Sequence, residues 1–168
     1  MLLIGGAAAM TREPFIFPSL GPTALMLFAH PLRRDSSPRH VIIGHAIGAC
    51  SGYAALAITG LLSVPFGPDV TLRRVFAATI AIGLTAAFTT LARAEHAPAG
   101  ATTLVVALGI MPQLTDLIAL MLAIVALTLL CLIVNRLAGI AYPLWNPIEH
   151  IWRGSVADDA NERVERRY

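Results

Sequence analysis

Two short apolar segments of this chain begin with a similar pattern, in which a proline and a glycine stand shortly before a threonine. When Gly21 is aligned with Gly100, Thr23 falls on Thr102. The first N–H groups of a helix have no partner within it, and their dipoles favour an anion. We predict that both segments are unwound helix starts that bind a small anion, with glycine needed for close approach and a left-handed backbone. The candidate substrate-binding residues are Ser19, Gly21, Thr23, Pro98, Gly100, Thr102 and Thr103.

Two histidines complete the candidate site. His45 lies one turn inside a long apolar run, where an ionisable residue is a functional candidate, although a bond to a nearby carbonyl explains it equally well. His96 immediately precedes the second segment and follows Glu95. It is interpreted either as a titratable gate at the mouth of an anion path or as a loop histidine bonded to Glu95.

The motifs of several enzyme classes do not occur in the sequence. It has no phosphate-binding loop, no dinucleotide fingerprint and no His-Glu-x-x-His. The five histidines are scattered and the two cysteines lie in apolar runs. We therefore expect no metal, no cofactor, no nucleic-acid partner and no enzymatic activity, although a wet cluster of His45, Glu95 and His96 would argue for a membrane enzyme.

The composition indicates an integral membrane protein. Hydrophobic residues make up 57% of the 168 residues and charged residues only 13%, which departs strongly from soluble domains. A membrane-spanning helix needs about 20 apolar residues. Uncharged runs at or near this length cover 41–68, 75–92, 97–115 and 117–135, and shorter ones cover 1–11 and 14–29.

These runs predict an all-α transmembrane bundle of about four full spans and two short broken helices. If every segment crosses the membrane, the two halves of the chain form an inverted repeat. The arginines of residues 33–39, Arg93 and Arg136 then share one side, which favours a cytoplasmic C-terminus and, in a bacterium, the inner membrane. In the alternative, the two short segments re-enter the membrane and return to the same side.

Residues 1–136 form the membrane region, and we expect its first span to be truncated. Residues 137–168 form an interfacial, charged tail, in which Tyr142, Trp145 and Trp152 suit the headgroup layer.

Gly44, Gly48 and Gly52 form a stripe on one face of the second span. Small residues at this spacing let two helix backbones approach closely. The stripe is interpreted as a packing face within the monomer or, alternatively, as a contact between copies in a homo-oligomer.

Three stretches, at residues 17–24, 37–45 and 96–102, resemble the HPP family of integral membrane proteins. The family is named after a His-Pro-Pro motif, whose place is taken here by His96-Ala97-Pro98, with Gly100 following. The resemblance covers roughly residues 14–135. It implies a four-span membrane protein, and it suggests nitrite transport because plant and cyanobacterial members are implicated in that activity.

The sequence as a whole therefore predicts a membrane transporter or channel for a small inorganic anion, embedded in a lipid bilayer. A membrane module that assembles with partners and transports nothing is the alternative. A polar cavity beside Gly21 and Gly100 would favour transport.

Overall fold

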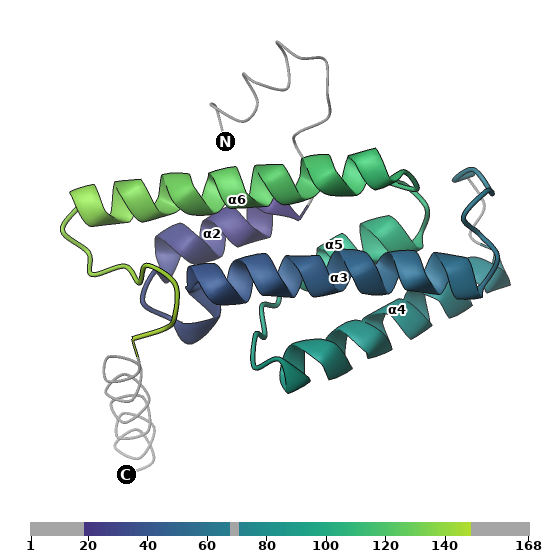
Figure 1. The fold of residues 1–168 in the computed structure, drawn as a ribbon, viewed down its shortest axis with the longest axis horizontal. Helices are drawn as coiled ribbons and strands as arrows, with labels where there is room; N and C mark the ends of the chain where they lie inside the picture. Colours follow the sequence, from purple (N-terminus) through teal and green to yellow (C-terminus); the bar gives the residue numbers. More distant parts are fainter. Residues whose placement is uncertain (1–18, 68–70, 149–168) are drawn as a thin grey trace, which may run out of the picture.

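The computed structural model describes residues 19–67 and 71–148, and this part of the chain is helical, as predicted (Figure 1). Its elements, in chain order, are α2 (Leu20–Ala29), the short 3-10 helix η1 (Arg34–Ser36), α3 (Pro38–Ile58), α4 (Leu72–Leu91), α5 (Ala99–Ala107) and α6 (Leu114–Leu137). The expected helix at residues 1–11, Trp152 and the charged end of the tail lie outside the described residues.

Three helices of the described part are long and apolar enough to cross a membrane, namely α3, α4 and α6. The run at 97–115, which we expected to be close to a full span, forms only the nine-residue α5, about 14 Å long. Helix α5 ends at Ala107 because Gly109 adopts a left-handed φ of 76°. The second predicted short helix thus begins at the expected place, and the count of four full spans stays a prediction because the first predicted span lies outside the described residues.

The two short helices, α2 and α5, run in opposite directions. In Figure 1 each begins near the middle of the bundle, and the two extend towards opposite ends. Helix α5 packs on α3 and α4, whereas α2 packs on α6. Leu20, Leu27, Leu120, Ile124 and Leu127 form the largest part of the core between α2 and α6.

The glycine stripe of α3 faces α5 inside the chain. A Cβ added to Gly48 would lie 2.8 Å from the backbone oxygen of Ala99 and from the Thr103 hydroxyl, and one added to Gly52 would lie 2.8 Å from the backbone oxygen of Thr103. These distances are too short for a side chain, so the glycines are what allows the two helices to touch. Packing within the monomer is confirmed. Helix α5 and the loop before it cover Gly44, Gly48 and Gly52, so this stripe is not available for a contact between copies.

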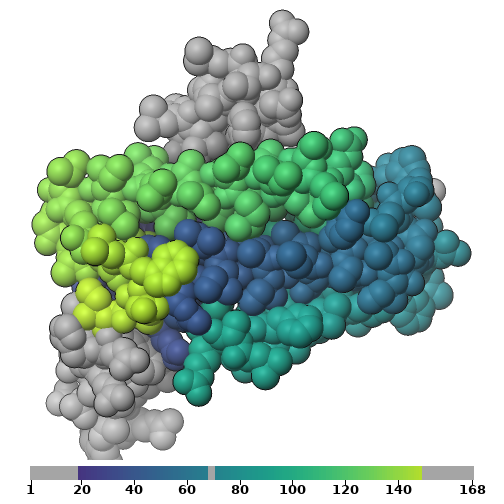
Figure 2. All heavy atoms as spheres, in the orientation of Figure 1, coloured from purple at the N-terminus to yellow at the C-terminus, as the bar shows by residue number. Residues whose placement is uncertain are grey.

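Arg39, in the first turn of α3, and the loop that carries Arg93 meet at one end of the bundle. The Arg39 guanidinium donates to the carbonyls of Arg93 and Ala92, at 2.7 and 2.8 Å. Tyr142, in the segment after α6, reaches the same end. The segment packs over the first turn of α3, where the Arg39 N–H donates to the Trp145 carbonyl at 3.1 Å (Figure 2). The predicted grouping of these loops is thus observed, while their cytoplasmic side remains a prediction.

Tyr142 packs inside the protein, and its predicted place at the depth of the headgroup layer stays a prediction. Its side chain is fully buried, and its hydroxyl donates to the Ser36 carbonyl at 2.6 Å. Trp145 is 46% exposed, which agrees with an interfacial position. The buried hydroxyl of Tyr142 therefore fastens the segment after α6 to η1.

Candidate functional site

His45 contacts both of the threonines that were paired when Gly21 was aligned with Gly100. Its Nε2 lies 2.9 Å from the Thr23 hydroxyl in α2, and its Nδ1 lies 2.8 Å from the Thr102 hydroxyl in α5. All three side chains are fully buried. The glycine stripe brings α5 against α3, and the first turn of α2 reaches the same imidazole from the other side. The predicted pairing of Thr23 with Thr102 therefore corresponds to a physical link.

His96 extends this cluster. Its Nε2 lies 3.5 Å from the Thr23 hydroxyl, and its Nδ1 lies 2.8 Å from the Asp35 carbonyl oxygen. The rings of His45 and His96 meet edge to face, with centroids 5.0 Å apart. The expectation that His96 bonds Glu95 is wrong, because its partner is the backbone of η1 and Glu95 is exposed.

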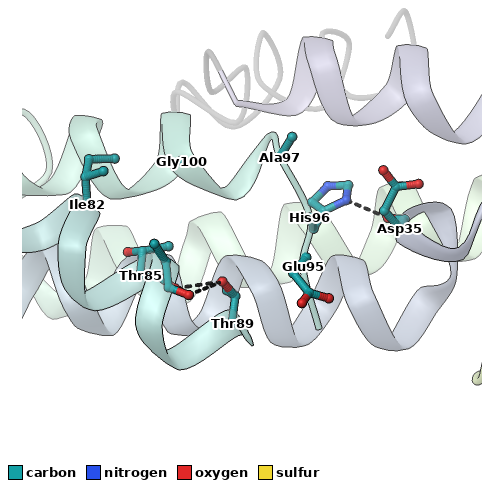
Figure 3. A pocket seen from close by; sticks show the side chains of 9 residues that line it. Asp35, Ile82, Thr85, Thr89, Glu95, His96, Ala97 and Gly100 are labelled. Atoms are coloured by element: carbon teal, nitrogen blue, oxygen red, sulfur yellow. Dashed lines mark hydrogen bonds between the residues drawn. The ribbon is translucent and has the colours of Figure 1, made fainter. Parts of the chain in front are cut away.

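An open pocket of about 350 Å³ lies beside the cluster (Figure 3). His96, itself only 4% exposed, forms part of the pocket wall. The other lining residues come from α4, from the loop before α5, from the first turn of α5 and from η1: Asp35, Ile82, Thr85, Ala86, Thr89, Glu95, Ala97 and Gly100. His96 therefore touches the pocket on one side and the buried threonine of α2 on the other.

The sequence reasoning missed Thr85 and Thr89. Both are buried side chains of α4 that line the pocket. The Thr85 hydroxyl lies 2.9 Å from that of Thr103, which also donates to the Ala99 carbonyl at 3.1 Å. Thr103 thus links α5 to α4 and does not bond His45. The available signal was the spacing of Thr85 and Thr89, four residues apart on one face of a membrane helix.

The helix start of α5 does not offer free N–H groups, which corrects the first prediction. Those of Ala99, Gly100 and Ala101 donate to the carbonyls three residues earlier, at 3.0 to 3.1 Å. Pro98, the N-cap residue, already has right-handed helical angles. The segment is therefore wound, and its polar contribution comes from side chains and the helix dipole.

The start of α2 is wound as well. Ser19, its N-cap residue, has right-handed helical angles, and its carbonyl accepts a bond from the Thr23 hydroxyl at 2.8 Å. Neither Gly21 nor Gly100 has a positive φ, and a Cβ added to either would meet nothing within 4 Å. The expected need for a left-handed glycine is wrong at both positions. Because Gly100 lines the pocket, a side chain added there would extend into that space.

Arg74 is an arginine whose side chain is used inside the fold. Its side chain is 3% exposed. The guanidinium donates to the carbonyls of Leu108, Val64 and Pro65. It thereby supplies hydrogen-bond donors to main-chain oxygens at the end of α5 and in the loop after α3. These oxygens would otherwise lack partners.

His96 lies in the loop between α4 and α5, outside the three spans. Burial lowers the pKa of His96 to about 4, and the bond to the Asp35 carbonyl acts in the opposite direction. Burial therefore favours the neutral ring. Within residues 19–67 and 71–148, no group of three or more metal-binding side chains occurs.

Three apolar spans and two opposed short helices around a buried histidine and threonine cluster define an integral membrane protein. The family model for the HPP transmembrane region matches residues 1–143. The chain belongs to the HPP family, as the motifs around Gly21, His45 and His96 predicted. No curated protein and no solved structure matches it.

Proposed function

We propose that this protein is a transporter or channel for a small inorganic anion, and that its role is transport and not catalysis. The observation that carries the proposal is the meeting of two opposed short helices at one imidazole, His45. Half-helices of this kind form the anion site in several transporters, since each N-terminus carries a partial positive charge. The hydroxyls of Thr23 and Thr102 bond this imidazole and hold it between the two helix starts.

The cluster of Thr23, His45, His96 and Thr102 contains no arginine, which supports transport over tight storage. An anion held by dipoles and hydroxyls loses its water at moderate cost and is released again, whereas a buried arginine would hold it strongly. The nearby guanidinium groups of Arg39 and Arg74 are bonded to main-chain carbonyls, so they are not part of this donor set.

The packing of the helices supports an inverted repeat. Helix α5 lies on α3, and its counterpart α2 lies on α6, the counterpart of α3. Two halves of opposite orientation would place equivalent residues on both sides of a central site. Thr23 and Thr102, which the alignment of the two halves pairs, bond the two nitrogens of the same ring.

The alternative, a membrane module that transports nothing, has less support. It would be favoured if the segments at Gly21 and Gly100 were surrounded only by packed apolar atoms. Gly100 instead lines an open pocket with polar residues. Nitrite as the substrate, the bacterial inner membrane and a cytoplasmic C-terminus belong to the proposal through the family resemblance and the arginine distribution.

The test is anion uptake by purified protein in liposomes. We expect uptake of at least one of nitrite, nitrate, formate and chloride above that of protein-free vesicles. Thr102→Val should reduce it several-fold, because one hydrogen bond contributes about 1 kcal/mol, and Thr102→Ser should restore it. Ala126→Val, at an exposed position of α6, is the matched control. Wild-type protein that moves none of these anions would favour the membrane module.

A further inference from the structure

The cluster forms a chain of hydrogen bonds in which every donor can point the same way. The Asp35 carbonyl can only accept, so His96 carries its proton on Nδ1 and donates it there at 2.8 Å. Its Nε2 is then an acceptor that faces the Thr23 hydroxyl at 3.5 Å. On the other side, Thr102 donates to His45 Nδ1, and His45 Nε2–H donates to the Thr23 oxygen.

The Thr23 hydroxyl has two possible acceptors for its one proton. It faces His96 Nε2, but the Ser19 carbonyl lies closer, at 2.8 Å. When the hydroxyl turns towards Ser19, its oxygen lone pairs remain free for two donors. A doubly protonated His96 would then donate to Asp35 through Nδ1 and to Thr23 through Nε2. Both protonation states of His96 therefore leave the side-chain polar atoms of Thr23, His45, His96 and Thr102 with partners.

We propose that His96 takes up one proton together with each transported anion, and that the Thr23 hydroxyl accommodates both protonation states by turning between His96 and Ser19. In this step the neutral ring gains one proton from the pocket, so that both of its nitrogens carry one. No bond between heavy atoms forms or breaks. The inference rests on the proposed anion transport and names its coupling ion.

The electrostatics of the site explain why the proton and the anion bind together. Burial keeps the ring neutral when the pocket is empty. An anion within about 4–6 Å raises the pKa of a neighbouring base by about 1–3, so anion binding favours proton uptake. By thermodynamic reciprocity, the protonated ring also raises the affinity for the anion.

The charged and titratable groups around His96 include no fully buried counter-ion for a protonated ring. They are His40 and His45 of α3, Asp35 of η1 and Glu95 of its own loop, with Arg34 and Arg39 acting on His40. The Asp35 carboxylate is already paired with Arg33 at 2.9 Å, and Glu95 is exposed to solvent screening. A proton on His96 therefore has no fully buried counter-ion until an anion arrives.

The experiment measures proton and anion uptake in the same liposomes. An entrapped pH dye reports protons, and nitrate and chloride are used beside nitrite, because the acid forms of these two strong-acid anions do not carry protons through lipid. Protein-free vesicles supply the blank. We expect internal acidification that follows anion uptake, near one proton per anion.

Three variants test the roles of the residues. His96→Gln should lower the proton-to-anion ratio several-fold, because an amide cannot take up a proton. Thr23→Val should lower it as well, while Thr23→Ser, which keeps the hydroxyl, should restore it. Ala126→Val should keep the wild-type ratio. Nitrogen NMR of the His96 ring in detergent gives a readout that does not depend on transport: its pKa should rise when nitrate is added to wild-type protein.

The outcomes separate the two proposals. Anion uptake without acidification, or a wild-type proton ratio in His96→Gln, would overturn the coupling and leave anion transport standing. An NMR pKa that nitrate does not change would overturn the coupling too. Absence of uptake of every anion tested would overturn both.

Discussion

Replacing Gly48 with alanine tests the contact between α3 and α5 most sharply. The new Cβ would lie 2.8 Å from the Ala99 carbonyl oxygen and 2.8 Å from the Thr103 hydroxyl, whereas ordinary contacts begin at 3.4 Å. One of these atoms is backbone, so the helices must separate by about half an ångström. Overpacking of this kind costs about 1–3 kcal/mol.

The control for this variant is Gly83→Ala, in the exposed part of α4. A Cβ there meets nothing within 4 Å, so only the helix preference of alanine acts, which is about 0.5–1 kcal/mol in favour of the folded state. The same gain applies at Gly48 and is outweighed by the clash. We expect the two variants to differ by about 2 kcal/mol, or about 4–8 °C in melting temperature.

The assay is thermal unfolding in detergent, followed by circular dichroism. Gly48→Ala should melt below wild type and Gly83→Ala at or above it. Equal melting temperatures for the two variants would mean that α5 does not lie against the glycine stripe of α3. The proposed site, which depends on that contact, would then be wrong.

Three further predictions concern the same melting assay. Arg74→Met should cost about 2–4 kcal/mol, because it leaves buried carbonyls without a donor, while the exposed neighbour Arg73→Met should change little. Tyr142→Phe should cost about 1 kcal/mol through loss of the bond to Ser36, and an unchanged melting temperature would show that this bond does not hold the segment. The folded-state pKa of His96, about 4, lies below its unfolded value of about 6.5, so its contribution is fully present above pH 6.5 and is lost as the pH falls towards 4. Stability should fall in that window by about 3 kcal/mol, and His96→Gln should show a shallower fall than wild type.

Much of the fold could be predicted from composition and spacing. Uncharged runs of sufficient length mark α3, α4 and α6, and glycines at every fourth position mark the helix contact. The run at 97–115 is equally apolar, but apolar composition does not set helix length. The left-handed turn at Gly109 ends α5 early, and Arg74 stabilises that end from another helix. Such a contact between residues far apart in the sequence leaves no local pattern.

Four of the predicted site residues meet in the structure, while their part in binding a substrate stays a prediction. His45, His96, Thr23 and Thr102 all belong to the observed cluster, because ionisable and hydroxyl residues are costly in lipid unless they meet one another. The bonding pattern depends on which faces of α2 and α5 meet α3, and the sequence does not specify that. The N–H groups that we expected to be free at Gly100 instead form hydrogen bonds within the turn from His96 to Ala101. Tertiary packing determines whether this turn forms.

The most direct test of the central claim compares anion uptake by Thr23→Val, Thr102→Val and the double variant in liposomes. Both threonines bond the same imidazole, so each single change should slow uptake several-fold, by about 1 kcal/mol. The double variant should lose less than the product of the two, because residues that share a partner are not additive. Uptake by both single variants at the wild-type rate, with intact melting temperatures, would show that the anion does not pass the His45 cluster.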